Sequence, residues 1–167
     1  MGTHEHRKAG KKEISVAIVS VSTTRTMETD ESGAWIEKQA KKEGFLVVDR
    51  RVVMDSQEEV RKAVRDIIRD HNADGIILTG GTGIAKADVT VEALMPMFRK
   101  ELTAFGPVFA QLSFDEIDSA AILSRATAGI IYNTAVFAIP GSLKACKLAC
   151  NALIFPEIAH VSKHARD

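Results

Sequence analysis

Cysteine is scarce in this sequence, and the two cysteines present follow no familiar cross-linking pattern. Cys146 and Cys150 lie four positions apart in a segment of helical character, so they would share one helix face. This spacing fits neither a zinc finger nor the disulfide framework of a small secreted domain, so we expect both side chains to pack in the core. The N-terminal segment is polar rather than a signal peptide, and we therefore expect a cytoplasmic protein.

Net charge and long apolar runs are also missing. The 167 residues contain 22 Lys and Arg against 22 Asp and Glu. Without an excess of positive charge, no long-range attraction favours nucleic acid or an anionic membrane surface. No apolar stretch reaches the roughly 20 residues that a membrane-spanning helix needs. We therefore expect neither nucleic acid nor membrane as a partner, and any anionic ligand must be bound by a local site.

The residues that are present suit one compact α/β domain. Hydrophobic residues make up 46% of the chain, which is enough for a substantial core. We expect residues 1–12 to form a flexible arm and residues 13–167 to form a single domain. Strand-like and helical patterns alternate, with strands expected at 14–21, 45–54 and 75–79 and helices at 35–42 and 56–72. The alternation predicts a mostly parallel central sheet with helices on both faces, a three-layer sandwich.

The second half of the domain is expected to be mainly helical. Ser113 and Glu116 match a capping box, which predicts that a helix begins there. Short apolar runs at 129–132 and 135–139 indicate two strands joined in a hairpin or one bent strand.

Two further features of this half have alternative interpretations. The apolar side chains at 105–112 either pack against the sheet, which we favour, or form an exposed interface. Glu157, His160 and His164 recur at helical spacing and could share a helix face as transition-metal ligands, an interpretation we disfavour because nothing else in the sequence converges on them.

A glycine-rich loop after the third expected strand is the main functional signal. Gly80, Gly81 and Gly83 lack a Cβ, so their backbone amides can approach a bound anion closely. An ordinary tight connection between a strand and a helix is the alternative. We expect the next helix to begin near residue 91 with Thr90 as its N-cap, which leaves Asp88 available to bind magnesium beside phosphates. Asp88 as the cap is the alternative.

A second carboxylate and a second tight turn also follow directly after expected strands. Asp55 follows the second expected strand, and Ser56 begins a capping box that frees Asp55 from capping. Ligands of parallel sheets bind at the carboxyl ends of the strands, so Asp55 is a candidate metal ligand, with a solvated turn residue as the alternative. Gly141 and Ser142 form another tight turn before a helix, where an anion can again bind. Together these features favour a site that binds nucleotides.

Beyond these patterns, the sequence resembles the MoaB/MogA family of molybdenum and tungsten cofactor biosynthesis and the related G domain of gephyrin. The segments that carry the resemblance are TDESG at 29–33, LTGGTGIAKADVTVEAL at 78–94, LSRATAGI at 123–130 and IPGS at 139–142. They cover nearly the whole chain after the first dozen residues, which makes the match more specific than a single glycine motif.

The resemblance implies molybdopterin adenylyltransferase activity. In such a reaction, ATP and molybdopterin are the substrates, and Mg²⁺ supports transfer of AMP to the terminal phosphate of the pterin. The resemblance implies that Gly80, Gly81, Thr82 and Gly83 line the nucleotide and phosphate site, that Gly141 and Ser142 receive the pterin, and that Asp55 and Asp88 act in catalysis as the metal ligands. It also implies a homotrimer or a hexamer.

Four positions depart from the pattern of that family. Thr23 and Ala87 replace charged residues, and Pro107 and Ala110 replace polar or charged ones. Loss of an arginine weakens the binding of phosphates. A non-catalytic oligomer that keeps the fold and binds a pterin or a protein is therefore the alternative hypothesis. A P-loop NTPase is disfavoured, because no GK[ST] follows the glycines.

Overall fold

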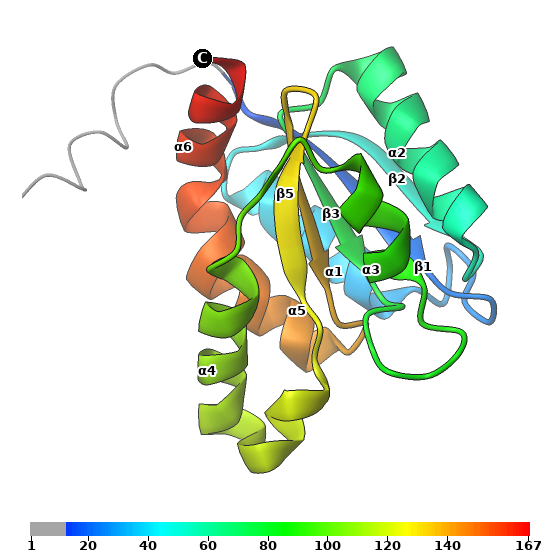
Figure 1. Ribbon diagram of the computed structural model, residues 1–167. Helices are drawn as coiled ribbons and strands as arrows, with labels where there is room; N and C mark the ends of the chain where they lie inside the picture. Colours follow the sequence, from blue (N-terminus) through cyan, green and yellow to red (C-terminus); the bar gives the residue numbers. More distant parts are fainter. Residues whose placement is uncertain (1–12) are drawn as a thin grey trace, which may run out of the picture.

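The computed structural model describes residues 13–167, so the arm predicted at 1–12 lies outside the described residues. A six-stranded sheet in the order β2-β1-β3-β6-β5-β4 forms the centre (Figure 1). β1 (Ser15–Val21), β2 (Leu46–Val53), β3 (Gly75–Thr79) and β6 (Thr134–Ile139) run parallel. β5 (Thr127–Ile131) and the short β4 (Lys100–Glu101) extend the sheet in antiparallel fashion. The predicted mostly parallel sheet is confirmed, and the segment at 127–139 is a hairpin.

The helices cover both faces of this sheet. They are α1 (Glu31–Lys42), α2 (Gln57–His71), α3 (Thr90–Leu94), α4 (Phe105–Ile117), α5 (Leu143–Ala149) and α6 (Phe155–Arg166). The 3₁₀ turns η1 (Met95–Met97) and η2 (Asp118–Leu123) follow α3 and α4, and the π-helical turn η3 (Cys150–Ile154) joins α5 to α6. No helix within residues 13–167 is both long and apolar enough to cross a bilayer.

Alternation along β1 shows why the sheet holds two layers of helices. Val16 and Ile18 belong to a core shared with α1, α4, α5 and α6, whereas Ala17 and Val19 belong to a second core shared with α2 and α3. Successive residues of a strand point to opposite faces, so a continuous apolar run has to be covered on both sides. The three-layer sandwich follows directly.

The ends of two helices differ from the sequence-based prediction. α1 begins at Glu31, four residues early, because Oδ1 of the buried Asp30 accepts a hydrogen bond from the amide of Gly33 (3.0 Å). Ser113 does not start a helix. It is buried within the continuous helix α4, where its surroundings rather than its capping pattern determine its conformation.

A buried carboxylate ties the amino-terminal edge of the sheet together. Asp74 Oδ2 accepts hydrogen bonds from the amide and hydroxyl of Ser15 (2.9 and 3.0 Å), and its Oδ1 accepts one from Arg166 (2.6 Å). Burial raises the pKa of Asp74, but the bonds from Ser15 and the charge of Arg166 outweigh it, and the net pKa is lowered. This network stabilises the edge opposite to the glycine loop.

Candidate functional site

The two predicted loops meet at the carboxyl edge of the sheet. The amide of Gly80 donates to the carbonyl of Ile139 (3.0 Å), which fixes the glycine loop beside the end of β6. A Cβ on Gly141 would lie 3.2 Å from the Cα of Gly80, and a Cβ on Gly80 would lie 2.5 Å from the carbonyl oxygen of Val21. Only glycine permits such close approach of backbone to backbone. The loops after β1, β3 and β6 therefore form one surface.

The glycine loop turns its carbonyls inward and leaves three amides available. Gly80 and Gly81 have φ values of 96° and 67°. The buried Thr90 holds both of them, since its hydroxyl donates to the carbonyl of Gly80 (2.8 Å) and its amide to that of Gly81 (2.9 Å). Within the described residues, the amides of Gly81, Thr82 and Gly83 have no hydrogen-bond acceptor. Consecutive free amides next to left-handed glycines form the concave kind of backbone that binds anions.

Thr90 is therefore not the N-cap of α3, and that prediction is wrong. Val89 occupies the cap position without a capping side chain, so the alternative of Asp88 as the cap is wrong too. Asp88 is half-buried and its Oδ2 accepts a hydrogen bond from the amide of Ala85 (2.8 Å). A Cβ on Gly83 would lie 2.7 Å from this oxygen, so the absence of a side chain there makes room for the carboxylate.

Asp55 lies at the same edge of the sheet. Ser56 caps α2 through the amide of Glu59 (3.5 Å), so Asp55 is free of the capping role, as predicted. Its Oδ2 accepts a hydrogen bond from the amide of Thr23 (2.7 Å), which links β2 to the loop after β1. Gln57, two positions beyond Asp55, lines the same groove as Asp88.

The carboxylates at 55 and 88 fit a magnesium ion in their chemistry. Each uses Oδ2 for one backbone amide, and Oδ1 of each has no hydrogen-bond partner among residues 13–167. No cluster of three or more His, Cys, Asp or Glu side chains that could hold a metal occurs in the described part of the chain. Magnesium prefers few protein carboxylates and completes its shell with water and substrate phosphates, so oxygen donors of this kind suit it.

The groove beside Asp88 has a volume of about 410 Å³. Its lining residues are Gln57, Ile84, Ala85, Lys86, Asp88, Val89, Glu92 and Arg125. Lys86 and Arg125 bring two positive charges to it. The pKa of Arg125 is raised, chiefly by its hydrogen bond to Glu92 and in part by the charge of Asp88. A groove with this mixture of charges suits a phosphate together with its metal ion.

Arg125 is a site residue that pattern reasoning missed. Its Nε donates to the carbonyl of Gly83 (2.9 Å), and both terminal nitrogens of its guanidinium bind the carboxylate of Glu92. The contact joins positions far apart in the chain, so no local pattern reports it. The available signal was an arginine in the LSRATAGI segment, directly before a buried strand.

The second loop is held by residues from the first connection. The carbonyl of Gly141 accepts hydrogen bonds from the hydroxyl of Ser32 (2.9 Å) and from Arg25 Nη1 (3.3 Å). Ser142 caps α5 by accepting from the amide of Ala145 (3.2 Å), as predicted. The exposed Arg25 thus adds a positive charge beside the predicted pterin loop, and sequence reasoning had assigned it no role.

Both cysteines are buried and free, as expected. Cys146 lies beneath the second loop, where its Sγ is 3.1 Å from the hydroxyl of Thr79 and 3.4 Å from the carbonyl of Pro140. Burial raises the pKa of both thiols, and that of Cys150 rises well above the usual value. Protonated, inaccessible thiols are packing residues rather than nucleophiles.

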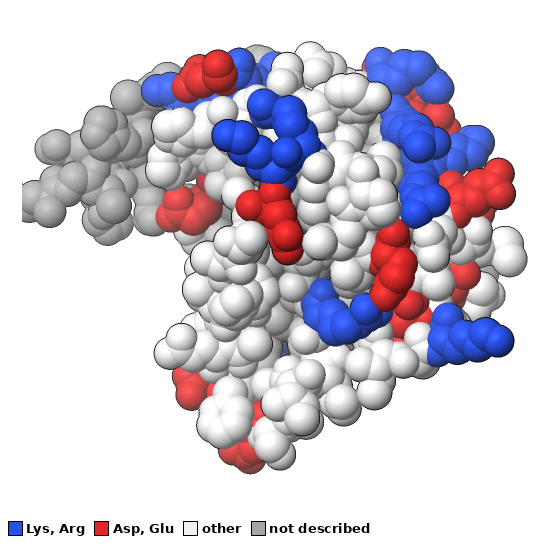
Figure 2. Space-filling model, in the orientation of Figure 1, with Lys and Arg blue, Asp and Glu red and all other residues white. Residues whose placement is uncertain are grey.

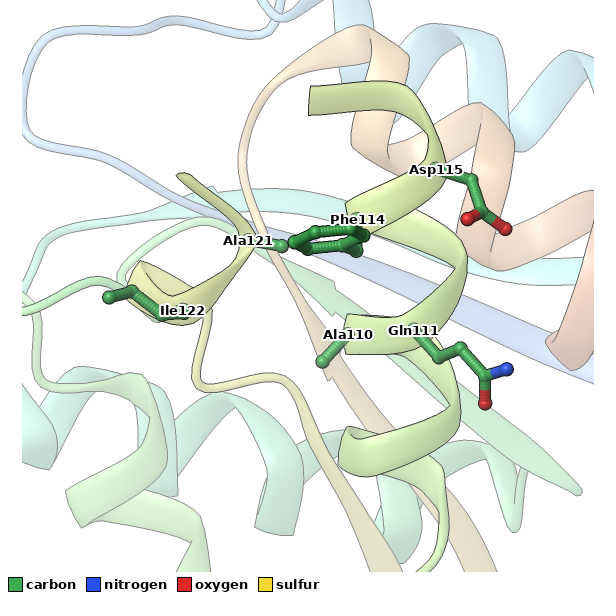
Figure 3. Close-up of a pocket in the computed structure, with 6 residues that line it drawn as sticks. All are labelled: Ala110, Gln111, Phe114, Asp115, Ala121 and Ile122. Carbon is green, nitrogen blue, oxygen red and sulfur yellow. The ribbon is translucent and has the colours of Figure 1, made fainter. Parts of the chain in front are cut away.

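A second and larger groove, of about 480 Å³, lies on α4 and η2 (Figure 3). It is lined by Ala110, Gln111, Phe114, Asp115, Ala121 and Ile122. Among the described residues that line it, Asp115 is the only charged one, and none of them also lines the groove at Asp88. We therefore assign the chemistry to the smaller groove.

The apolar surface of this region differs in detail from the one considered at 105–112. Phe109 is buried, and the ring of Phe105 packs on that of Phe137 with centroids 5.4 Å apart, so the expected packing against the sheet is correct for both. The exposed apolar side chains on α4 and η2 are instead Val108, Phe114, Ile117, Ile122 and Leu123. The part of Figure 2 that corresponds to α4 and η2 is mostly uncharged, with a few acidic residues.

The proposed transition-metal group on α6 is not supported. Nδ1 of His160 lies 3.3 Å from Glu157 and Nε2 of His160 lies 3.0 Å from Nε2 of His164. These contacts join the three side chains on one helix face, and Nδ1 of His164 also lies 4.0 Å from Asp167. No group of three or more His, Cys, Asp or Glu side chains within residues 13–167 could hold a metal ion.

Comparisons with known proteins agree with this architecture. A sequence family described as a probable molybdopterin binding domain matches residues 17–160. Molybdenum cofactor biosynthesis protein B of Bacillus subtilis is 44% identical over 167 residues, covering 99% of this chain and 98% of the relative. The protein of the same name from Escherichia coli K12 is 39% identical over 143 residues, covering 86% and 84%. The solved structure of tungsten cofactor synthesizing protein MoaB from Pyrococcus furiosus is 36% identical and superposes with a TM-score of 0.85, covering 95% of this chain and 100% of the other.

Proposed function

This chain belongs to the molybdopterin-binding-domain family of molybdenum and tungsten cofactor biosynthesis proteins, and we propose that it transfers AMP from ATP to the terminal phosphate of molybdopterin. A bond forms between an oxygen of the pterin phosphate and the α-phosphorus of ATP. The bond from the α-phosphorus to the oxygen that bridges it to the β-phosphate breaks, and pyrophosphate leaves. The attacking phosphate is already ionised near neutral pH, so no dedicated general base is needed.

The observation that carries the proposal is the contact between the two loops. Adenylyl transfer requires two anionic substrates to meet, and their mutual repulsion is the main electrostatic obstacle. The free amides of Gly81, Thr82 and Gly83 lie in the loop that touches the Gly141 turn. In the proposed complex, the first loop binds the phosphates of ATP and the Gly141–Ser142 turn receives the pterin.

The charged side chains complete the arrangement. Asp55 and Asp88 would hold magnesium through Oδ1 of each, which has no hydrogen-bond partner among residues 13–167, and the bound ion would neutralise charge on the nucleotide phosphates. Lys86 in the groove and Arg25 beside Gly141 would add positive charge on either side. Positive charge placed near the reacting phosphates stabilises the charge that develops in phosphoryl and nucleotidyl transfer.

The alternative, a non-catalytic protein that keeps the fold, rests on the four departures from the family pattern. The environments of three of them, Thr23, Pro107 and Ala110, are compatible with the catalytic proposal. Thr23 supplies a backbone amide to Asp55, a contact that does not depend on its side chain. Pro107 lies in the first turn of α4, where proline is tolerated, and Ala110 lines the apolar groove rather than the one at Asp88.

The direct test is incubation of the protein with molybdopterin, ATP and Mg²⁺, followed by detection of adenylylated molybdopterin and pyrophosphate. We expect both products in equal amounts and neither without Mg²⁺. The matched control is the Asp70→Asn variant, which changes an exposed carboxylate on α2 that pairs with Arg69. Binding of molybdopterin without any turnover would favour the non-catalytic alternative. Because the reaction consumes ATP, we also propose that it takes place in the cytoplasm.

By the same family resemblance we propose a homotrimer, with pairing of trimers into a hexamer as the larger form. The exposed apolar side chains on α4 and η2 are the described surface that such an assembly would bury, and Ile122 is the most exposed of them at 80%. Light scattering coupled to gel filtration should give three or six times the mass of 18.1 kDa. A monomeric mass at micromolar concentration would refute the proposal.

A further inference from the structure

The second half of the glycine loop depends on a contact from outside the loop. We propose that Arg125 is a positioning residue that fixes the anion-binding backbone by holding the carbonyl of Gly83. The inference deepens the proposed function, because it concerns the loop to which that function assigns the phosphates of ATP. Arg125 would act through the backbone and would not itself need to touch the substrate.

The two halves of the loop are anchored differently. In the first half, the carbonyls of Gly80 and Gly81 are held by the buried Thr90. In the second half, the carbonyl of Gly83 accepts its hydrogen bond from Nε of Arg125 at 2.9 Å. Glycine has no side-chain restriction on φ and ψ, so an unanchored peptide at this position could rotate readily. The bond to Arg125 therefore selects one orientation.

That orientation determines where the next amide points. A peptide unit is planar and trans, so the direction of the Gly83 carbonyl fixes the opposite direction for the amide of Ile84. The following turn is closed by the amide of Ala85, which donates to Asp88 (2.8 Å). Arg125 thus stabilises the backbone between the free amides of Gly81–Gly83 and the candidate metal ligand Asp88.

Arg125 is itself held in a rigid frame. Both terminal nitrogens of its guanidinium bind Glu92, and this hydrogen bond is the main reason why the pKa of Glu92 is lowered. Glu92 lies on α3, and Arg61 of α2 binds the main chain of that helix through the carbonyl of Ala93 (3.0 Å). The frame therefore runs from α2 through α3 and Arg125 to the loop.

The planar guanidinium is needed for this arrangement. It can donate to Gly83 through Nε while its other nitrogens bind Glu92, whereas the single ammonium of lysine cannot reproduce the fork. The side chains of Arg125 and Glu92 are 35% and 43% exposed, so their ion pair contributes little to global stability. Removal of Arg125 should disturb the loop without unfolding the domain.

The test compares Arg125→Ala, Arg125→Lys and Glu92→Gln with Arg69→Ala, which removes an exposed arginine that pairs within α2. Hydrogen exchange is followed in peptides that contain the amides of Ala85 and Asp88, in protein without substrates. Titration calorimetry measures binding of inorganic pyrophosphate in the presence of Mg²⁺. Thermal unfolding and the KM for MgATP are measured on the same samples.

We expect Arg125→Ala to speed exchange in the loop and to weaken pyrophosphate binding, each about tenfold, or about 1.4 kcal/mol. The KM for MgATP should rise by a similar factor while the unfolding midpoint stays near that of Arg69→Ala. Arg125→Lys should recover part of the affinity, and Glu92→Gln, which keeps the bond to Gly83, should lose less than Arg125→Ala.

Unchanged exchange and unchanged pyrophosphate affinity in Arg125→Ala would overturn the inference. A loss of pyrophosphate affinity in Arg125→Ala that is accompanied by an unfolding midpoint clearly below that of Arg69→Ala would also overturn it. Such a result would indicate a general structural role. The proposed function is tested by a different measurement, which is the formation of adenylylated molybdopterin by the unsubstituted protein. Absence of that product, combined with the expected exchange pattern, would refute the reaction and support the positioning role.

Discussion

Replacement of Asp88 by asparagine should separate the chemistry of the site from its structure. The two side chains have nearly the same shape. Among the described residues, the side chain of Asp88 makes one hydrogen bond, in which it accepts from the amide of Ala85, and the amide oxygen of asparagine can accept the same bond. The change should therefore alter the free energy of unfolding by no more than about 0.5 kcal/mol, as for most partly exposed positions.

The effect on turnover should be far larger. Asparagine removes one of the two negative charges proposed to hold magnesium and leaves only Asp55. Loss of one group that stabilises charge in a transition state typically lowers kcat by about 10² to 10³, equivalent to about 2.7–4 kcal/mol. We expect a decrease in this range for Asp88→Asn, together with a requirement for more Mg²⁺ to reach half-maximal rate.

The assay is release of pyrophosphate from ATP in the presence of molybdopterin, measured over a titration of Mg²⁺. Asp88→Ala provides a second comparison, because alanine also removes the acceptor for the amide of Ala85. It should cost about 1 kcal/mol more stability than asparagine but little further activity. Turnover and Mg²⁺ dependence in Asp88→Asn equal to those of the unsubstituted protein would refute the assignment of Asp88 to the metal.

Three further predictions concern the scaffold. Asp74→Asn should lower the free energy of unfolding by about 2–3 kcal/mol at pH 7, since it removes the negative charge that binds Arg166 and replaces one of the two acceptor oxygens with a donor. The pKa of Asp74 is lowered in the fold, so its contribution is present above the unfolded pKa of about 3.9 and is lost as pH falls through the folded value; melting curves from pH 6 to pH 2 should therefore fall more steeply for the unsubstituted protein than for Asp74→Asn. Thr90→Val leaves the carbonyl of Gly80 without its hydrogen-bond donor. It should lower the free energy of unfolding measured in urea by about 1–2 kcal/mol and weaken pyrophosphate binding; an unchanged urea midpoint would contradict the anchoring role of the hydroxyl. Gly80 has a φ of 96°, and Gly80→Ala would place a Cβ 2.5 Å from the carbonyl oxygen of Val21. The substitution should lower the free energy of unfolding by about 3 kcal/mol; a stable variant with normal phosphate binding would show that the backbone there can shift.

Local patterns in the sequence were sufficient for most elements of the first half of the fold, whereas the start of α4 and the short strand β4 were not predicted. A continuous β-branched run such as the one at β1 must be covered on both faces, and this requirement alone implies three layers. The capping serines Ser56 and Ser142 were identified correctly because an N-cap bonds only to amides two or three positions away. The glycine loops could also be located from local sequence, because each follows directly after an apolar strand.

Capping patterns failed where tertiary contacts competed with them. Thr90 has a good capping side chain, but it is fully buried and its hydroxyl finds the carbonyl of Gly80 instead. Ser113 matches a capping box, yet it packs inside α4. A polar side chain in a buried position bonds to whichever acceptor the fold brings near, and sequence spacing carries no information about that partner.

The sequence by itself therefore determined the alternation of strands and helices in the first half of the chain, the two glycine turns and the candidate carboxylates Asp55 and Asp88. Tertiary structure alone decided that Gly141 touches Gly80, that Asp55 accepts from Thr23 and that Arg125 reaches Gly83. The reason is physical: caps and turns form between neighbours in the chain, whereas these contacts join residues that come together only when helices and strands pack around a common core.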